Sequence, residues 1–173
     1  MIFYTWDTFE PISTKTVNYL NINANNATVI YRDNIVRLLN ANKCPYGHLQ
    51  ECYVVFELTI GDDQITTWHA PVEYAHLPAF NGSNRANIII DYDSCQHDAT
   101  SETISFNLVS DRAEPFVWIE SPSGVFDDNL LLINQPETKF RLSSSKLDCS
   151  SIKSSLRIFH PSMVSSNVST LEL

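Results

Sequence analysis

The sequence predicts an all-β protein made of small β-sandwich domains with one short helix. Short runs of β-branched and aromatic residues alternate with polar residues along most of the chain. Turn-forming residues separate these runs at intervals of about eight to twelve residues, a spacing typical of sandwiches. The 173 residues, 43% of them hydrophobic, suffice for one large domain or two small ones.

The first half is predicted to contain the helix as well as strands. Asn34 is a suitable cap for a helix near residues 34–41, and Ile35, Leu38 and Leu39 share one helical face. Gly61-Asp62-Asp63 supplies the turn of a hairpin. Strands are expected in this half at residues 2–6, 16–23, 28–31, 52–60 and 64–69.

Turn-forming residues at 78–84 predict a junction between a domain at 1–79 and a second at 80–160. The run 116–119 is continuously apolar, which predicts a strand buried on both faces with Trp118 in the core. The Ser-rich segment 161–173 is predicted to be a disordered tail. The other strands of this half are expected at residues 86–92, 103–109, 139–142 and 156–159.

The charge balance excludes some classes of partner. Eleven Lys and Arg against twenty Asp and Glu give a net charge of −9, which repels a nucleic-acid backbone. The chain has neither a basic cluster nor an apolar run long enough to span a bilayer, so no membrane partner is expected. The first residues lack the basic and apolar regions of a signal peptide.

Asparagine triplets and cysteines nevertheless point to an oxidising compartment. Asn26, Asn81 and Asn167 each begin an N-glycosylation triplet, although such triplets also occur by chance. The chain therefore suggests a fragment whose signal peptide lies on a missing upstream part.

The four cysteines are an even number. A bridge between Cys44 and Cys52 would close a short loop, and one between Cys95 and Cys149 a much longer loop, worth about 2.5 and about 4 kcal/mol by chain entropy. Free buried thiols and a zinc site remain alternatives at this point, although the five histidines are scattered.

Motifs for chemistry are scarce. The four glycines are too dispersed for a phosphate loop. Asp62-Asp63 lies in a predicted turn, and Asp127-Asp128 suits a solvated turn better than a Ca²⁺ site. We therefore expect no catalytic, ligand-binding or metal-binding residue and no cofactor. Core packing is also the first expectation for Trp6 and Trp68.

One segment resembles a known family. Residues 114–120, with the strand Pro-Phe-Val-Trp, are followed by Gly124-Val125-Phe126-Asp127-Asp128-Asn129 and an apolar strand. This order is similar to the closing domain of animal β-mannosidases. Tyr4-Thr5-Trp6 with Glu10-Pro11, and Leu38-Leu39 with Cys44 and residues 52–56, resemble the preceding domain. The similarity covers about residues 1–160.

The resemblance implies two consecutive immunoglobulin-like β-sandwich domains from a glycoside hydrolase of family 2 type. It further implies a lysosomal or secreted parent that removes terminal β-linked mannose from glycans, with its catalytic glutamates on an upstream (β/α)₈ barrel. This chain is too short for such a barrel. The predicted role is therefore non-catalytic support of the barrel, its partner, and the chain alone is expected to be inactive.

Two alternatives remain open. The chain could be a carbohydrate-binding module that uses Trp6 or Trp68 as an exposed stacking platform for a glycan. It could also be an unrelated immunoglobulin-like adhesion domain, although the Cys-Trp-Cys spacing of true immunoglobulin domains is absent within either half. Cys95 and Cys149 do bracket Trp118 in sequence.

Overall fold

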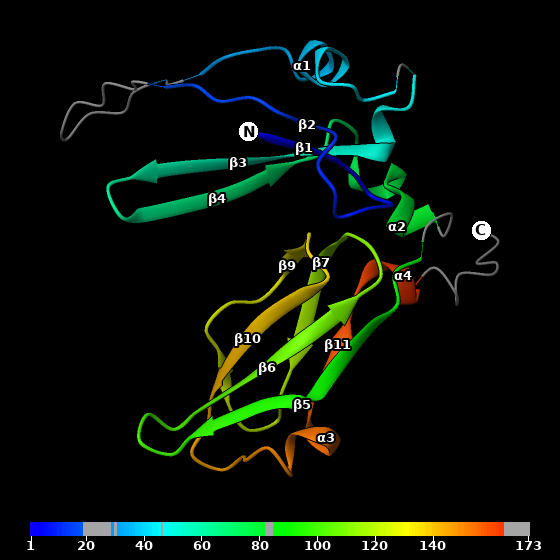
Figure 1. Cartoon of the computed structure of the whole chain (residues 1–173). Helices are drawn as coiled ribbons and strands as arrows, with labels where there is room; N and C mark the ends of the chain where they lie inside the picture. The colour runs from blue at the N-terminus through cyan, green and yellow to red at the C-terminus, as the bar shows by residue number, and fades with distance from the viewer. Residues whose placement is uncertain (19–28, 30, 46, 82–84, 165–173) are drawn as a thin grey trace. The chain divides into compact units, whose positions relative to one another are not determined.

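The computed structural model describes residues 1–18, 29, 31–45, 47–81 and 85–164 (Figure 1). The chain divides into two compact units, Met1–Leu77 and Pro78–Leu173, so the junction lies two residues before the one expected from sequence. Both units are built from antiparallel sheets, and the predicted all-β class is confirmed. In the described part of the chain, no helix is long and apolar enough to cross a membrane.

The first unit contains one four-stranded antiparallel sheet in the order β2-β1-β3-β4. Its strands are β1 (Ile2–Thr5), β2 (Ser13–Thr14), β3 (Cys52–Ile60) and β4 (Asp63–His69). The β3–β4 hairpin turns at Gly61, whose φ of 62° suits glycine. The strand expected at 16–23 does not form over residues 16–18. The rest of it lies outside the described residues, as do residues 28 and 30 of the strand expected at 28–31, and residues 29 and 31 are not in a strand.

Helix α1 (Ile35–Ala41) covers one face of this sheet and forms where helical spacing predicted it (Figure 1). The Asn34 side chain accepts a hydrogen bond from the Arg37 backbone N–H at 3.1 Å and so caps the first turn. Leu38 and Leu39 are buried against Phe3. Two 3₁₀ turns, η1 (Leu49–Glu51) and η2 (Tyr74–His76), flank the β3–β4 hairpin.

Aromatic rings occupy the other face of the sheet. The Tyr53 ring stacks on Tyr4 and on Trp6, with centroids 5.3 and 4.2 Å apart. Trp68 meets the edge of Trp6 at 6.0 Å. Trp6 is 3% exposed and donates its indole N–H to the Gln50 carbonyl, which places it in the core. Burial is also the largest cause that raises the pKa of Tyr53.

The second unit is a two-sheet sandwich. Its sheets have the orders β5-β6-β10-β8 and β11-β7-β9, with antiparallel pairing throughout. The strands are β5 (Ile88–Asp98), β6 (Thr103–Ser110), β7 (Glu114–Glu120), β8 (Val125–Phe126), β9 (Leu131–Ile133), β10 (Glu137–Ser143) and β11 (Arg157–Phe159).

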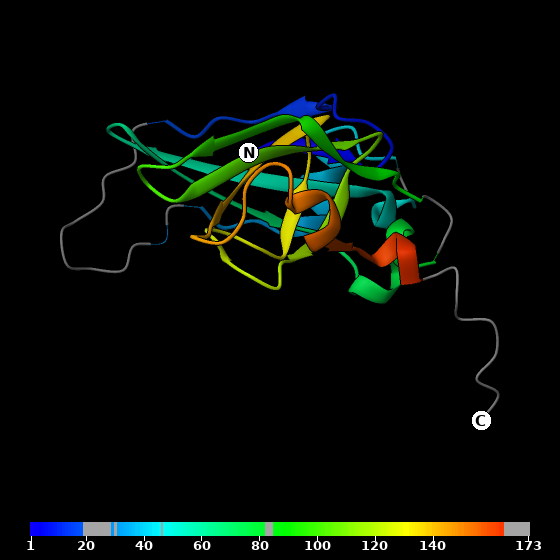
Figure 2. The same cartoon turned by 90° about the horizontal axis from the view of Figure 1, so that it is seen from below.

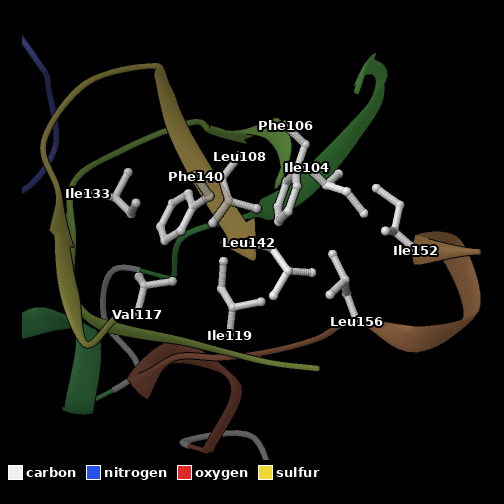
Figure 3. Packing of buried hydrophobic residues seen from close by; sticks show 10 residues of the cluster. All are labelled: Ile104, Phe106, Leu108, Val117, Ile119, Ile133, Phe140, Leu142, Ile152 and Leu156. Carbon is white, nitrogen blue, oxygen red and sulfur yellow. The ribbon is translucent and has the colours of Figure 1, made fainter. Parts of the chain in front are cut away.

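The core of this unit lies between the two sheets, as Figure 3 shows. Strict alternation in β6 buries Ile104, Phe106 and Leu108, and Phe140 and Leu142 of the neighbouring strand β10 lie beside them on the same face of the sheet. The opposite sheet and the segment before β11 supply the remaining buried members, which are Val117, Ile119, Ile133, Ile152 and Leu156. Period-two patterning therefore determines this core strand by strand.

In addition to α1, the described residues contain three further one-turn helices, all in the second unit. They are α2 (Pro78–Asn81), α3 (Ile152–Ser155) and α4 (Pro161–Val164), the last drawn in red at the end of the described chain (Figures 1 and 2). The prediction that the tail is disordered from residue 161 is thus wrong for 161–164, while 165–173 lies outside the described residues.

A buried polar cluster holds α4 in place. Glu114 is 0% exposed, and its Oε1 accepts the Ser162 backbone N–H at 2.9 Å. The same oxygen contacts His160 Nδ1 at 3.0 Å. Ser162 Oγ accepts the Ala86 backbone N–H at 3.2 Å. Composition alone could not reveal these bonds, because they link residues far apart in sequence.

Candidate functional site

The outer face of β7 and β11 carries the most distinctive exposed side chains of the second unit. In β7, Val117 and Ile119 point into the core, whereas Trp118 and Glu120 are exposed. Trp118 is 40% exposed, so its predicted core position is wrong. The physical reason is that a β-strand buries both faces only when a second layer covers each of them.

The pairing of β7 with β11 extends this face across two strands. Phe159 lies directly opposite Trp118, and Arg157 directly opposite Glu120. Directly opposite residues of an antiparallel pair project to the same side of the sheet. Phe159 is 45% exposed, so the four side chains form an aromatic pair beside a pair of opposite charges.

An open groove of about 660 Å³ borders this face. Its volume is in the range of sites for small molecules. Polar and apolar groups line it together, and Glu120 supplies its one carboxylate among the residues the structure describes. The lining residues are Trp118, Ile119, Glu120, Ser121, Pro122, Gly124, Val125, Phe126, Asn129, Ser154, Ser155 and Arg157.

The polar groups of the groove are partly committed. The Trp118 indole N–H donates to Glu120 Oε1 at 3.3 Å, which orients both side chains. Ser154 and Ser155 donate their hydroxyls to backbone carbonyls of the α3 turn. Arg157 is exposed, and within the described ranges its guanidinium has no ion pair or side-chain hydrogen bond.

Asn129, which lines the groove, fixes its own loop to strand β7. Its Nδ2 donates to the Ile119 carbonyl at 2.7 Å, and its Oδ1 accepts the Ile119 backbone N–H at 2.8 Å. The same oxygen accepts the backbone N–H of Leu130, a residue with a φ of 59°. The asparagine thus acts like one residue of a neighbouring strand and fixes the loop to β7.

Gly124 fixes the other end of the same loop. Its φ is +150°, and a Cβ there would lie 2.7 Å from the Leu142 Cδ1 and 2.8 Å from the Ser143 carbonyl oxygen. Only glycine fits this close approach of two backbones. Ser144 donates its hydroxyl to the Ser123 carbonyl at 2.7 Å beside it. Gly124 and Asn129, two residues of the segment that resembles the family, therefore have structural roles.

Trp6 and Trp68, the two tryptophans considered from sequence as stacking platforms, are less exposed than Trp118. Trp6 is buried, so it is not available as a stacking platform. Trp68 is half-buried and lies between Trp6 and Tyr74, whose ring centroid is 6.2 Å away. The sequence missed Trp118 because its apolar neighbours Val117 and Ile119 hid the alternation of the strand.

The acidic pairs considered from sequence serve as turn residues. Asp128 accepts the Asn129 backbone N–H at 2.8 Å, and the Asp127 carboxylate lies 3.7 Å from Arg141. Asp62 is in the β3–β4 turn and Asp63 begins β4. Across the described positions, no cluster of three or more His, Cys, Asp or Glu is arranged to hold a metal.

Asp148, like Asp33, is an acid whose pKa is strongly lowered. Hydrogen bonds from the Ser150 and Ser151 side chains, with that of the Ser151 backbone, lower the pKa of Asp148 to about 2. These bonds form the turn that leads into α3, which borders the groove. Their role is structural.

Both disulfides weighed from sequence are present. Cys44 joins Cys52, and Cys95 joins Cys149 across 54 residues. Cys95 and Cys149 pack on the core side of the sandwich, whereas Trp118 faces outward. The packing of a tryptophan on the disulfide, typical of immunoglobulin domains, is therefore absent here.

The three glycosylation triplets remain predictions from sequence. Asn26 and Asn167 lie outside the described residues, and the side chain of Asn81, the last residue of α2, is not described either. Comparison with known proteins adds no family assignment. No family model matches the chain, and no curated protein matches it.

Proposed function

We propose that this chain is the non-catalytic C-terminal part of a β-mannosidase-type glycoside hydrolase, where it supports an upstream catalytic barrel. The observation that carries the proposal is the role of the motif residues. Gly124 and Asn129, which belong to the segment resembling β-mannosidases, hold strands and loops together. Residues with this role are expected in a domain that gives structural support to a catalytic domain.

The distribution of carboxylates supports a non-catalytic role. Hydrolysis of a glycosidic bond by the usual route requires two carboxyl groups about 5 to 9.5 Å apart across the bond. The groove beside β7 contributes Glu120 alone from the described residues. The buried Glu114 is engaged by His160 and the Ser162 backbone.

The two disulfides support a lysosomal or secreted location for the parent, because they form and persist in oxidising compartments. The first unit also offers an apolar groove on its sheet, lined in part by Phe56, Leu58 and Ile65. Ile65 is 60% exposed in a strand, an arrangement that suits contact with the barrel.

The parentage is tested on the native gene product. We expect the transcript to encode a (β/α)₈ barrel in frame upstream of Met1. An antibody against residues 85–160 should detect, in extracts of the source, a polypeptide several times longer than this chain. A native product of only this length, with no barrel encoded upstream, would contradict the proposal.

The missing catalytic role is tested separately on residues 1–173. The purified chain should not hydrolyse a chromogenic β-mannoside faster than buffer does. A Glu120→Gln variant is the matched control, since it removes the one carboxylate of the groove. Turnover by the wild-type chain that this substitution abolishes would show that the chain is itself an enzyme.

A further inference from the structure

The exposed face of β7 and β11 places aromatic and charged side chains side by side. Trp118 and Phe159 present aromatic surface from neighbouring strands, and both are at least 40% exposed. Glu120 and Arg157 occupy the next position along the same two strands. The groove of about 660 Å³ opens alongside Trp118, Glu120 and Arg157.

We propose that this face binds one neutral pyranose unit of a glycan, with Trp118 as the stacking platform. The C–H face of a sugar ring packs on an aromatic plane, while its hydroxyls need donors and acceptors at the edge of that plane. Arg157 supplies donors, and the Glu120 carboxylate supplies acceptors. The face therefore offers both an aromatic surface and polar groups beside it, the two kinds of contact that a sugar makes.

The charges favour a neutral ligand. Glu120 would repel an anionic ligand and Arg157 a cationic one, whereas a hydroxyl both donates and accepts hydrogen bonds. The guanidinium of Arg157 has no partner in the described part of the chain, so a ligand does not have to break an ion pair. Glu120 is already held by the Trp118 indole N–H.

The frame beneath the face is rigid, which lowers the entropy lost on binding. Val117 and Ile119 anchor β7 in the core, and Asn129 holds both backbone groups of Ile119. Ser154 and Ser155 of the α3 turn also line the groove. The platform is thus preformed.

The site goes beyond the proposed support of a barrel and does not depend on it. Sugar binding is measured on the purified chain, whereas parentage is read from the gene. Either result can therefore fail while the other stands.

The experiment uses residues 1–173 with methyl β-mannoside, cellobiose and N,N′-diacetylchitobiose as probes. In ¹H–¹⁵N spectra, the Trp118 indole N–H should shift and saturate with at least one probe, while that of the buried Trp6 stays in place. Trp118→Phe assigns the signal. No saturable shift with any probe overturns the proposal.

Variants separate recognition from folding. Trp118→Ala should weaken the affinity at least tenfold, and Arg157→Gln several-fold, with thermal midpoints close to that of the wild type. Trp68→Phe is the matched control in the other unit, and it should leave the affinity unchanged. Equal weakening by Trp68→Phe would move the site to the first unit and overturn the assignment.

A protein partner is the competing occupant. If the face joins two copies of the chain, sedimentation should show a dimer that Trp118→Ala converts to monomer. That result, with no sugar binding, would replace the glycan site by an interface. A monomeric wild type whose Trp118 signal saturates with sugar supports the proposal.

Discussion

Asn129 illustrates how one side chain can replace a missing length of strand. Its amide satisfies both backbone groups of Ile119 and also the Leu130 N–H, where the backbone has a positive φ. A buried backbone group that loses its partner destabilises the folded state. The fold therefore depends on the identity of this residue more than its partial exposure suggests.

Replacing Asn129 should consequently destabilise the second unit. We expect Asn129→Ala to lower the free energy of unfolding by about 2 to 3 kcal/mol, because two well-formed backbone hydrogen bonds lose their partner. Urea denaturation measures the change. Asn87→Ala is the matched control at an exposed position and should change the stability by less than about 0.5 kcal/mol. Equal losses of stability in Asn129→Ala and Asn87→Ala would contradict a special structural role of Asn129.

The lowered pKa of Asp148 makes the stability of its turn depend on pH. Its pKa is lowered from 3.8 to about 2 by hydrogen bonds that only the folded turn makes. A carboxyl with a lowered pKa adds stability above its unfolded pKa, and this contribution is lost as the pH falls through the folded value. The contribution of the turn is therefore full above about pH 4 and disappears near pH 2.

The titration of Asp148 can be followed by NMR. Ser150→Ala should raise the pKa of Asp148 toward its ordinary value, because it removes a donor at 2.7 Å. Ser154→Ala is the control, since Ser154 donates to a backbone carbonyl and not to Asp148. An unchanged pKa of Asp148 in Ser150→Ala would show that the Ser151 hydroxyl and the backbone donors are sufficient to lower it.

At the scale of elements, the two disulfides close loops of very different length. Cys44–Cys52 spans 8 residues and ties the segment after α1 to the start of β3. Cys95–Cys149 spans 54 residues and ties β5 to the segment before α3. A cross-link restricts the unfolded chain more strongly when its loop is longer.

The longer bridge should therefore stabilise its unit more. Replacing Cys95 and Cys149 together by alanine should lower the free energy of unfolding of the second unit by about 4 kcal/mol, and replacing Cys44 and Cys52 that of the first by about 2.5 kcal/mol. Urea unfolding, followed at resolved NMR signals of each unit, measures both. A larger loss for the shorter loop would contradict the entropic explanation.

At the scale of the whole molecule, each unit has its own hydrophobic core and its own disulfide. Leu38, Leu39 and Phe3 belong to the core of the first unit. Phe106 and Leu142 belong to that of the second. A small domain buries a limited share of its surface, so the cross-link matters in both.

We expect residues 1–77 and 78–173 each to fold when expressed alone under oxidising conditions. Far-UV circular dichroism should show β structure, and each piece should unfold in a cooperative transition, because its core does not need the other piece. The same pieces with alanine in place of their cysteines serve as controls and should melt at lower temperature. A first unit that stays unfolded alone would mean that it needs a partner surface.

The resemblance to β-mannosidases concerns the whole chain. It rests on the order of segments along nearly the whole chain, and the parentage proposal needs the upstream sequence to test it. Glycan binding at Trp118 and Arg157, by contrast, can be measured on the purified chain alone.

Local sequence patterns were sufficient to predict the β3–β4 hairpin, the strand β6, helix α1, the all-β class and an even set of cysteines. These are local properties: β6 buries every second residue because successive side chains of a strand point to opposite sides. The hairpin at Gly61 and the cap at Asn34 likewise depend on neighbours in sequence.

The exposure of Trp118 and the burial of Trp6 and Glu114 depend on tertiary packing. Trp118 and Trp6 both occur in apolar or aromatic runs, yet one faces solvent and the other the core. Glu114 Oε1 contacts Nδ1 of His160, a residue 46 positions away. Burial depends on what packs over a face, and that layer comes from distant parts of the chain, which alternation within one strand does not encode.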